Sequence, residues 1–170
     1  MKIILLIILF LIPVLYGFRL SVNLENCFKN IRYYNLCLEK MYIKITQYLM
    51  PLEDIFLELS NENIKPFDVI FINIHRRIIS GGESFKDIYL SEFCATQALL
   101  GFDKEEMNLI KNTAELLGSS NVEGQEKFLK GLIQLSEKIL KSREEEYKKT
   151  SSAYKKLGIM AGLFLVIVFI

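Results

Sequence analysis

The stretch His75-Arg76-Arg77 groups the only histidine of the chain with two arginines, and it is the first place to look for chemistry. A catalytic histidine needs a neighbouring carboxylate or nucleophile, and the sequence contains no recognisable arrangement of that kind. Two interpretations remain open. The stretch is either a contact for acidic lipid headgroups or an acidic partner surface, or the solvated face of a helix.

The acidic run Glu144-Glu145-Glu146 is a second candidate partner contact. Such a run can dock a basic surface, but it is also typical of a solvated helix face. Glu115 presents a similar choice, because it precedes Gly118 near an expected turn. It is either structural or a contact for a metal or a partner.

The sequence contains no recognisable motif for a nucleotide site, a zinc site or a disulfide. Gly81-Gly82 lacks the Lys-Ser/Thr that follows in a phosphate-binding loop, so we expect no nucleotide site. With one histidine and no Cys-x-x-Cys, we expect no zinc site. Cys27 and Cys37 are ten residues apart, about 15 Å along a helix and beyond disulfide reach. We therefore predict buried reduced thiols at these positions and at Cys94. Because no catalytic or ligand-binding motif is found, we also expect no cofactor and no enzymatic activity. A membrane enzyme with an unrecognised site is the alternative.

Charge excludes another class of partner. The 170 residues include 21 basic and 20 acidic side chains. Without Lys2, which lies in the apolar N-terminal region, the basic and acidic residues balance. A neutral middle region has no surplus for a polyanion, so nucleic acid is not expected as a partner.

Two uncharged apolar segments, residues 3–17 and 157–170, enclose this middle region. As helices they would span about 22 and 21 Å, against about 30 Å of hydrocarbon. We predict transmembrane helices over 1–19 and 154–170, lengthened by neighbouring apolar side chains and snorkelling lysines; a monotopic hairpin is the alternative. A signal peptide is the alternative for the first segment, but Leu15 is bulky for the position two before Gly17, which favours an uncleaved anchor.

Positive charge near these segments lies almost entirely toward the middle of the chain, whereas Lys2 and the amino terminus lie on the other side. The positive-inside rule therefore predicts that the middle region is cytoplasmic. The cations on which this prediction depends are Arg19, Lys29, Arg32, Lys148, Lys149, Lys155 and Lys156.

The middle region, residues 20–153, has helical periodicity throughout and no strand pattern. A first long helix continues from the membrane segment and ends near Met50-Pro51. Short helices follow Pro51, Pro66 and Ser84. The expected inward residues are Leu20, Leu24, Cys27, Ile31, Tyr34, Leu38, Met41, Ile45 and Tyr48, then Leu52, Ile55, Phe56 and Leu59, then Val69, Ile70, Ile74 and Ile78, and then Phe85, Ile88, Tyr89 and Phe93.

Asp103 with Glu106 three residues later predicts a capping box for a fifth helix that ends at Gly118. Residues 119–121 then cap a last helix from about Val122 that runs into the C-terminal apolar segment. Its expected inward residues are Phe128, Leu132, Leu135 and Ile139, and its expected acid–base pairs are Glu137–Lys141, Glu144–Lys148 and Glu145–Lys149. The predicted fold is an all-α antiparallel helical bundle between two transmembrane helices, with long helices continuing from both membrane segments.

The order of several short patterns resembles a known family over essentially the whole chain. These patterns are Gly17-Phe18, Pro51-Leu52-Glu53, Gly82-x-Ser84-Phe85, Leu117-Gly118-Ser119-Ser120-Asn121-x-x-Gly124-Gln125 and Lys155-Lys156-Leu157-Gly158-x-x-x-Gly162-Leu163. Together they resemble the stage III sporulation protein AB family of endospore-forming Firmicutes. Departures from the family pattern at Lys44-Ile45, Gln47, Tyr89 and Asn121 leave the implied fold intact.

This resemblance implies a middle region similar to the cytoplasmic domain of the inner-membrane platform proteins of type II secretion and type IV pilus systems. It also implies a place in the sporulation apparatus between mother cell and forespore, in the outer forespore membrane. The implied partners are the secretion-type ATPase of the stage III sporulation protein AA family, other membrane proteins of the same complex, the lipid bilayer and further copies of the chain.

Two functions are carried forward from the sequence. The first is a non-enzymatic membrane platform that couples the ATPase to the membrane assembly. The second is a membrane-anchored helical module that binds or regulates an unrelated cytoplasmic protein.

Overall fold

The computed structural model describes residues 2–118 and 122–169, and these residues form six α-helices and no strand. The predicted all-α class is confirmed. The helices are α1 (Lys2–Thr46), α2 (Leu52–Ser60), α3 (Phe67–Ser80), α4 (Phe85–Leu100), α5 (Lys104–Leu117) and α6 (Val122–Phe169).

The chain divides into two compact units. One, the terminal unit, comprises Met1–Lys29 and Lys141–Ile170, and the other, the central unit, comprises Asn30–Leu140. α1 and α6 each continue through both units as one helix, as predicted. The predicted domains 1–19, 20–153 and 154–170 are defined by where the chain would enter a bilayer, whereas the two units are defined by packing. The predicted domain boundaries therefore stay a prediction.

Local sequence signals set the helix ends in the central unit. α4 begins after Ser84, whose Oγ accepts a hydrogen bond from the Asp87 backbone N–H at 3.2 Å. α5 begins with the predicted capping box, in which Asp103 and Glu106 each accept a backbone N–H. α3 ends at Gly81, where φ is 69°, a value that favours glycine. α5 ends before Gly118 as predicted, whereas the predicted cap at 119–121 lies outside the described residues.

An aromatic cluster from α1, α2, α3 and α4 forms the core of the central unit. The rings of Tyr89 and Phe93 lie 4.8 Å apart, and the Tyr34 hydroxyl lies 2.9 Å from both the Tyr89 hydroxyl and Thr113 Oγ1. Complete burial raises the pKa of Tyr89 well above its usual value, so this hydrogen-bonded group is neutral. The fully buried aromatic residues are Tyr34, Phe56, Phe67, Phe71, Tyr89 and Phe93.

Several expected inward residues are confirmed and others are wrong. The α1 stripe from Cys27 to Ile45 is buried, but Tyr48 follows the end of the helix and is exposed. In α3, Val69 is exposed because Phe67, Ile70, Phe71 and Ile74 turn the buried face away from it.

In α6 two residues of the inward stripe differ from the expected ones, each by one position along the chain. Phe128 is 66% exposed and Leu135 is 36% exposed, whereas Leu132 and Ile139 are buried as expected. Within residues 126–140 of α6 the buried residues, at spacings of three, four and three, are Leu129, Leu132, Ser136 and Ile139. Adjacent apolar residues at 128 and 129 fit the helical period equally well, so the period alone could not choose between them.

The three cysteines form no disulfide. Cys27 and Cys37 are buried as expected, but the prediction of a buried thiol is wrong for Cys94, which is exposed on α4. Burial raises the pKa of the Cys37 thiol to about 12, so it stays protonated at neutral pH.

Candidate functional site

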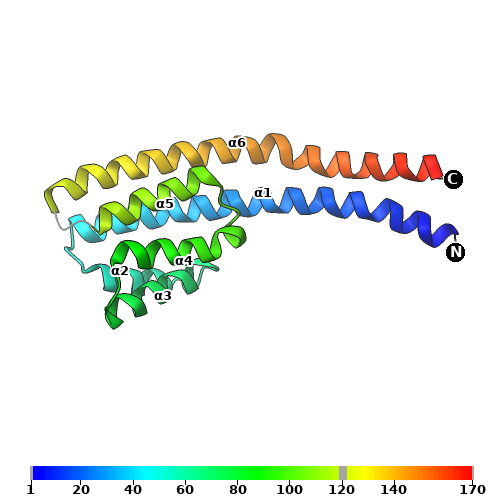
Figure 1. Cartoon of the computed structure of the whole chain (residues 1–170). Helices are drawn as coiled ribbons and strands as arrows, with labels where there is room; N and C mark the ends of the chain where they lie inside the picture. Colours follow the sequence, from blue (N-terminus) through cyan, green and yellow to red (C-terminus); the bar gives the residue numbers. More distant parts are fainter. Residues whose placement is uncertain (1, 119–121, 170) are drawn as a thin grey trace. The chain divides into compact units, whose positions relative to one another are not determined.

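The terminal unit is a pair of antiparallel helices, the first part of α1 beside the last part of α6 (Figure 1). Contacts run in opposite directions along the two helices, from Phe10 near Gly162 to Phe28 near Tyr147. The two helices thus form a hairpin-like pair, called here the terminal helix pair. It is the part of the molecule whose geometry points most directly to a function.

Three glycines allow the two backbones of the terminal helix pair to approach closely. A Cβ added at Gly17 would lie 2.5 Å from the Tyr154 carbonyl oxygen, and one at Gly158 would lie 2.7 Å from the Pro13 carbonyl oxygen. A Cβ at Gly162 would lie 2.8 Å from the Phe10 carbonyl oxygen and from its ring. Real Cβ atoms do not occupy such positions, so glycine is needed at all three, as it is at the close helix crossings of membrane proteins.

Polar and aromatic contacts continue the pair beyond the glycines. The buried hydroxyls of Ser21 and Ser151 share a hydrogen bond of 2.6 Å. Next toward the middle of the chain, the Phe28 and Tyr147 rings stack with centroids 5.7 Å apart. The helices are therefore joined by small residues in their apolar part and by larger side chains where charge begins.

The outward surface of the terminal helix pair is apolar. Both helices are long and apolar enough to cross a membrane, and only 11% of the most apolar 18-residue window of each is buried by protein. A core helix of a soluble protein would be mostly buried. The two helices are consistent with membrane spans. Among the exposed apolar residues are Ile4, Leu5, Ile8, Leu15, Leu157, Met160, Phe164 and Ile167.

The candidate contact His75-Arg76-Arg77 is divided among different environments on α3. His75 Nδ1 lies 2.8 Å from the Glu53 carbonyl oxygen of α2, so the ring serves packing between α2 and α3. Arg76 is exposed. Of the three side chains, Arg76 is therefore the most accessible to a partner.

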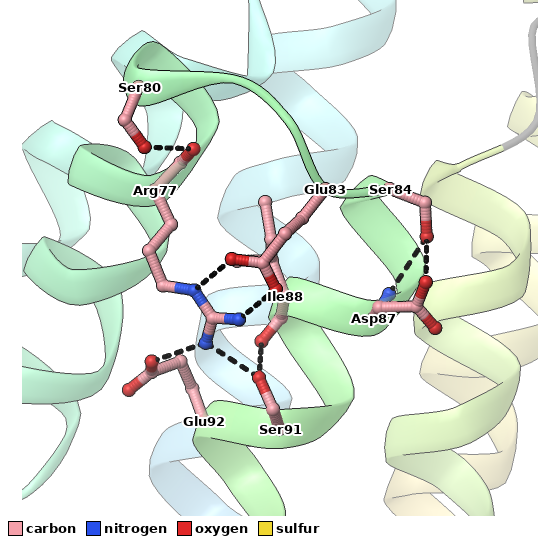
Figure 2. Close-up of polar contacts among 8 residues, drawn as sticks. All are labelled: Arg77, Ser80, Glu83, Ser84, Asp87, Ile88, Ser91 and Glu92. Carbon is pink, nitrogen blue, oxygen red and sulfur yellow. Dashed lines mark hydrogen bonds and ion pairs between the residues drawn. The ribbon is translucent and has the colours of Figure 1, made fainter.

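Arg77 connects α3 to α4 and to the turn between them (Figure 2). Its guanidinium donates to Glu92 Oε1 at 2.8 Å and to Ser91 Oγ at 2.6 Å, and it forms an ion pair with Glu83. Asn73 of α3 donates to the other carboxylate oxygen of Glu92 at 3.1 Å. Side chains of α3 thus bind both oxygens of this half-buried carboxylate. We call the contacts of Arg77 with Glu83, Ser91 and Glu92 the Arg77 latch, because they hold α3 and α4 together.

The acidic run Glu144-Glu145-Glu146 lies on α6 within the terminal unit, and each carboxylate has a cation on its own helix. Glu144 accepts from Lys148 at 2.6 Å and Glu145 lies 3.8 Å from Lys149, as two of the predicted acid–base pairs require. Glu146 accepts from Arg143 at 2.8 Å. The run therefore presents locally compensated charge.

Glu115 pairs across helices instead of binding at a turn. The Lys86 ammonium of α4 donates to it at 3.0 Å, and this hydrogen bond lowers the pKa of the carboxyl. No group of three potential metal-ligating His, Cys, Asp or Glu side chains forms among residues 2–118 and 122–169.

The close glycine packing was not predicted from the sequence. Gly158-x-x-x-Gly162 within an apolar segment is a known signal for close helix packing and could have indicated it. The partner surface around Pro13 and Gly17 carries no such signal. The Ser21–Ser151 hydrogen bond joins residues 130 positions apart, a distance over which no periodicity argument operates.

Comparison with known proteins gives consistent matches. The family model described as stage III sporulation protein AB matches residues 2–170. Stage III sporulation protein AB of Bacillus subtilis (strain 168) is 22% identical over 151 residues, which cover 89% of this chain and 88% of that protein. A solved structure of stage III sporulation protein AB, at 19% identity, has a TM-score of 0.64 and shares the fold over 69% of this chain and 93% of that one.

Proposed function

Because the chain belongs to the stage III sporulation protein AB family, and so has a role in sporulation, we propose that it is a non-enzymatic membrane platform. In this proposal it is a component of the secretion-like channel complex between mother cell and forespore. It couples the secretion-type ATPase of the stage III sporulation protein AA family to the membrane assembly. Its work is to hold other proteins in place.

The observation that carries this proposal is the terminal helix pair. Gly17, Gly158 and Gly162 bring its two helices into backbone contact, and its outward surface is apolar. Each of its helices continues without a break into the central unit. A helical domain joined to two packed membrane helices at once is held at the bilayer more firmly than by one span, as an attachment point requires.

The proposed location is the outer forespore membrane, with the middle region in the mother-cell cytoplasm. Support comes from the cations near the apolar segments, nearly all of which lie on the side of the middle region. Other membrane proteins of the complex and further copies of this chain are the proposed neighbours within the bilayer.

For the ATPase contact, the candidate residues remain His75, Arg76 and Arg77 on α3 and Glu144, Glu145 and Glu146 on α6. Arg76 is the candidate best placed for direct contact, because it is exposed while His75 and Arg77 bond to neighbouring elements of the central unit. An exposed cation of this kind would pair with an acidic surface on the ATPase.

The test is co-purification of the full-length chain, in mild detergent, with the ATPase from the same organism. Arg76→Glu should weaken the association roughly fivefold or more, the loss expected at a contributing interface residue. The control is Lys111→Glu at an exposed position of α5, which makes the same change in charge. No association of the unmodified chain by any sensitive method would contradict coupling and favour a binding module for another partner.

A further inference from the structure

The two ends of the chain carry one sign of charge. Residues 1–24 and 147–170 contain no aspartate or glutamate. They do contain Arg19, Lys155 and Lys156, which directly border the apolar segments. We call these three residues the basic collar.

The antiparallel packing of the terminal helix pair brings the collar to one level. Lys155 Nζ lies 5.8 Å from the centre of the Phe18 ring. Gly17 packs against the backbone of Tyr154 and Gly158 on one side of this contact, and Ser21 bonds to Ser151 on the other. Arg19, next to Phe18, therefore lies at the level of Lys155 and Lys156. Arg19 and Lys156 are exposed, and Lys155 is half-buried against the ring.

The collar cations differ from the cations farther from the apolar segments. Lys29, Lys148 and Lys149 each form a salt bridge with a glutamate one turn away. Within residues 2–118 and 122–169 none of the collar cations forms a salt bridge. The acid that Lys155 influences, Glu25, is held by a hydrogen bond from Lys29, and together these cations lower the pKa of its carboxyl.

In the proposed membrane placement the collar lies near the level of the lipid phosphates. The apolar run from residue 3 to residue 18 is about 24 Å long as a helix, which is shorter than a bilayer core of about 30 Å. Cations at its end must extend toward the headgroups, and Tyr16 and Tyr154 supply aromatic side chains of the kind found at that depth. Cations without acidic partners at this depth complement a headgroup with net negative charge.

We propose that the basic collar is a binding surface for anionic phospholipid headgroups, of which phosphatidylglycerol is the probe. The inference rests on the membrane placement proposed above and is independent of coupling to an ATPase. Bound anionic lipid would offset the mutual repulsion of the collar cations.

The experiment measures lipid binding to the full-length chain in neutral detergent by native mass spectrometry. Phosphatidylglycerol and phosphatidylcholine are added in equal amounts, and the ratio of the two lipid-bound populations is recorded. The unmodified chain should prefer phosphatidylglycerol. Replacing all three collar residues by glutamine should lower this ratio roughly tenfold or more, since each cation near an anionic surface adds on the order of a fivefold preference.

Matched variants separate the collar from net charge. Lys111→Gln, Lys127→Gln and Lys138→Gln together remove the same charge from exposed positions and should keep the preference. The charge-conserving set Arg19→Lys, Lys155→Arg and Lys156→Arg should keep it as well. If the glutamine variant of the collar fails to fold, the preference of the unmodified chain should still decrease as salt is raised, because exposed charges are screened.

Several results of this experiment would contradict the lipid-binding proposal or the membrane placement on which it rests. An equal preference in the unmodified chain and the glutamine variant of the collar would overturn the proposal, as would no preference in the unmodified chain. Displacement of the lipid by an equal concentration of glycerol phosphate would show a site for a soluble anion and would also overturn it. A chain that stays outside detergent micelles and vesicles altogether would contradict the proposed membrane placement itself.

Discussion

Gly158 illustrates how a missing side chain can hold two helices together. A Cβ added at Gly158 would lie 2.7 Å from the Pro13 carbonyl oxygen, and a Cβ added at Gly17 would lie 3.1 Å from the Cα atom of Gly158 itself. Pro13 lies inside α1, where a membrane helix tolerates proline if its neighbours satisfy the freed backbone groups. Close contact at this point brings the two backbones together and gains dispersion energy along both helices.

Replacing Gly158 by alanine should therefore force the helices apart. We expect a loss of about 1–3 kcal/mol in unfolding free energy, the usual cost of overpacking, measured by thermal or denaturant unfolding of the full-length chain in detergent. Gly131→Ala is the matched control, because a Cβ there meets nothing within 4 Å. That variant should be neutral or more stable by up to about 1 kcal/mol, as alanine favours helix. Equal destabilisation of both variants would contradict the role given to Gly158.

Some residue positions could be predicted from the sequence and others could not. Tyr34, Leu38 and Met41 lie on a long regular stripe, and all three are buried as predicted. Phe128 is exposed although its spacing is helical, because Leu129 beside it takes the inward position. Where two apolar residues are adjacent, only the packed partner decides which one is buried.

At the scale of elements, helix ends were predictable because their signals are local. Pro51, Ser84 and Asp103 act on the backbone within one turn of themselves, and the helices begin there. Links between helices depend on residues distant in sequence or separated by a turn of variable shape. The contact of His75 with the Glu53 carbonyl oxygen and the Arg77 latch belong to this class, so the basic stretch could be recognised but its structural use could not.

The Arg77 latch yields a prediction about α3 and α4. Arg77→Ala and Glu92→Ala should each destabilise the central unit, and the double variant should be less destabilised than the sum of the two. We expect a coupling free energy larger than that of an exposed pair on one helix, because Arg77 and Glu92 are 29% and 16% exposed and so less screened than surface pairs. The measurement is a double-mutant cycle on denaturant unfolding.

The exposed pair Lys148 and Glu144, one turn apart on α6, is the control for that cycle. Its coupling should be no more than about 0.5 kcal/mol, as for other exposed pairs on one helix. If Arg77 and Glu92 coupled no more strongly than this pair, the latch would be a surface contact that does not stabilise the central unit. Arg77 would then again be a candidate for contact with a partner.

At the scale of the whole molecule, the proposed membrane placement predicts on which side of the bilayer the central unit lies. An exposed cysteine of the central unit can report this location. Cys94 is exposed, while Cys27 and Cys37 are buried. The thiolate is the reactive form of cysteine, and burial raises the pKa of Cys37 to about 12. A membrane-impermeant maleimide at neutral pH should therefore modify Cys94 selectively.

Orientation can then be measured in growing cells that express the full-length chain. If the flanking cations place the middle region in the cytoplasm, Cys94 should be labelled only after the cells are opened, and Cys94→Ser should abolish that labelling. A reciprocal variant that combines Cys94→Ser with Lys2→Cys carries its introduced thiol on the predicted opposite side and should be labelled in intact cells. The reverse pattern would place the central unit outside the cell, where the proposed ATPase could not reach Arg76. In that case the charge asymmetry of the sequence would need an explanation other than topology.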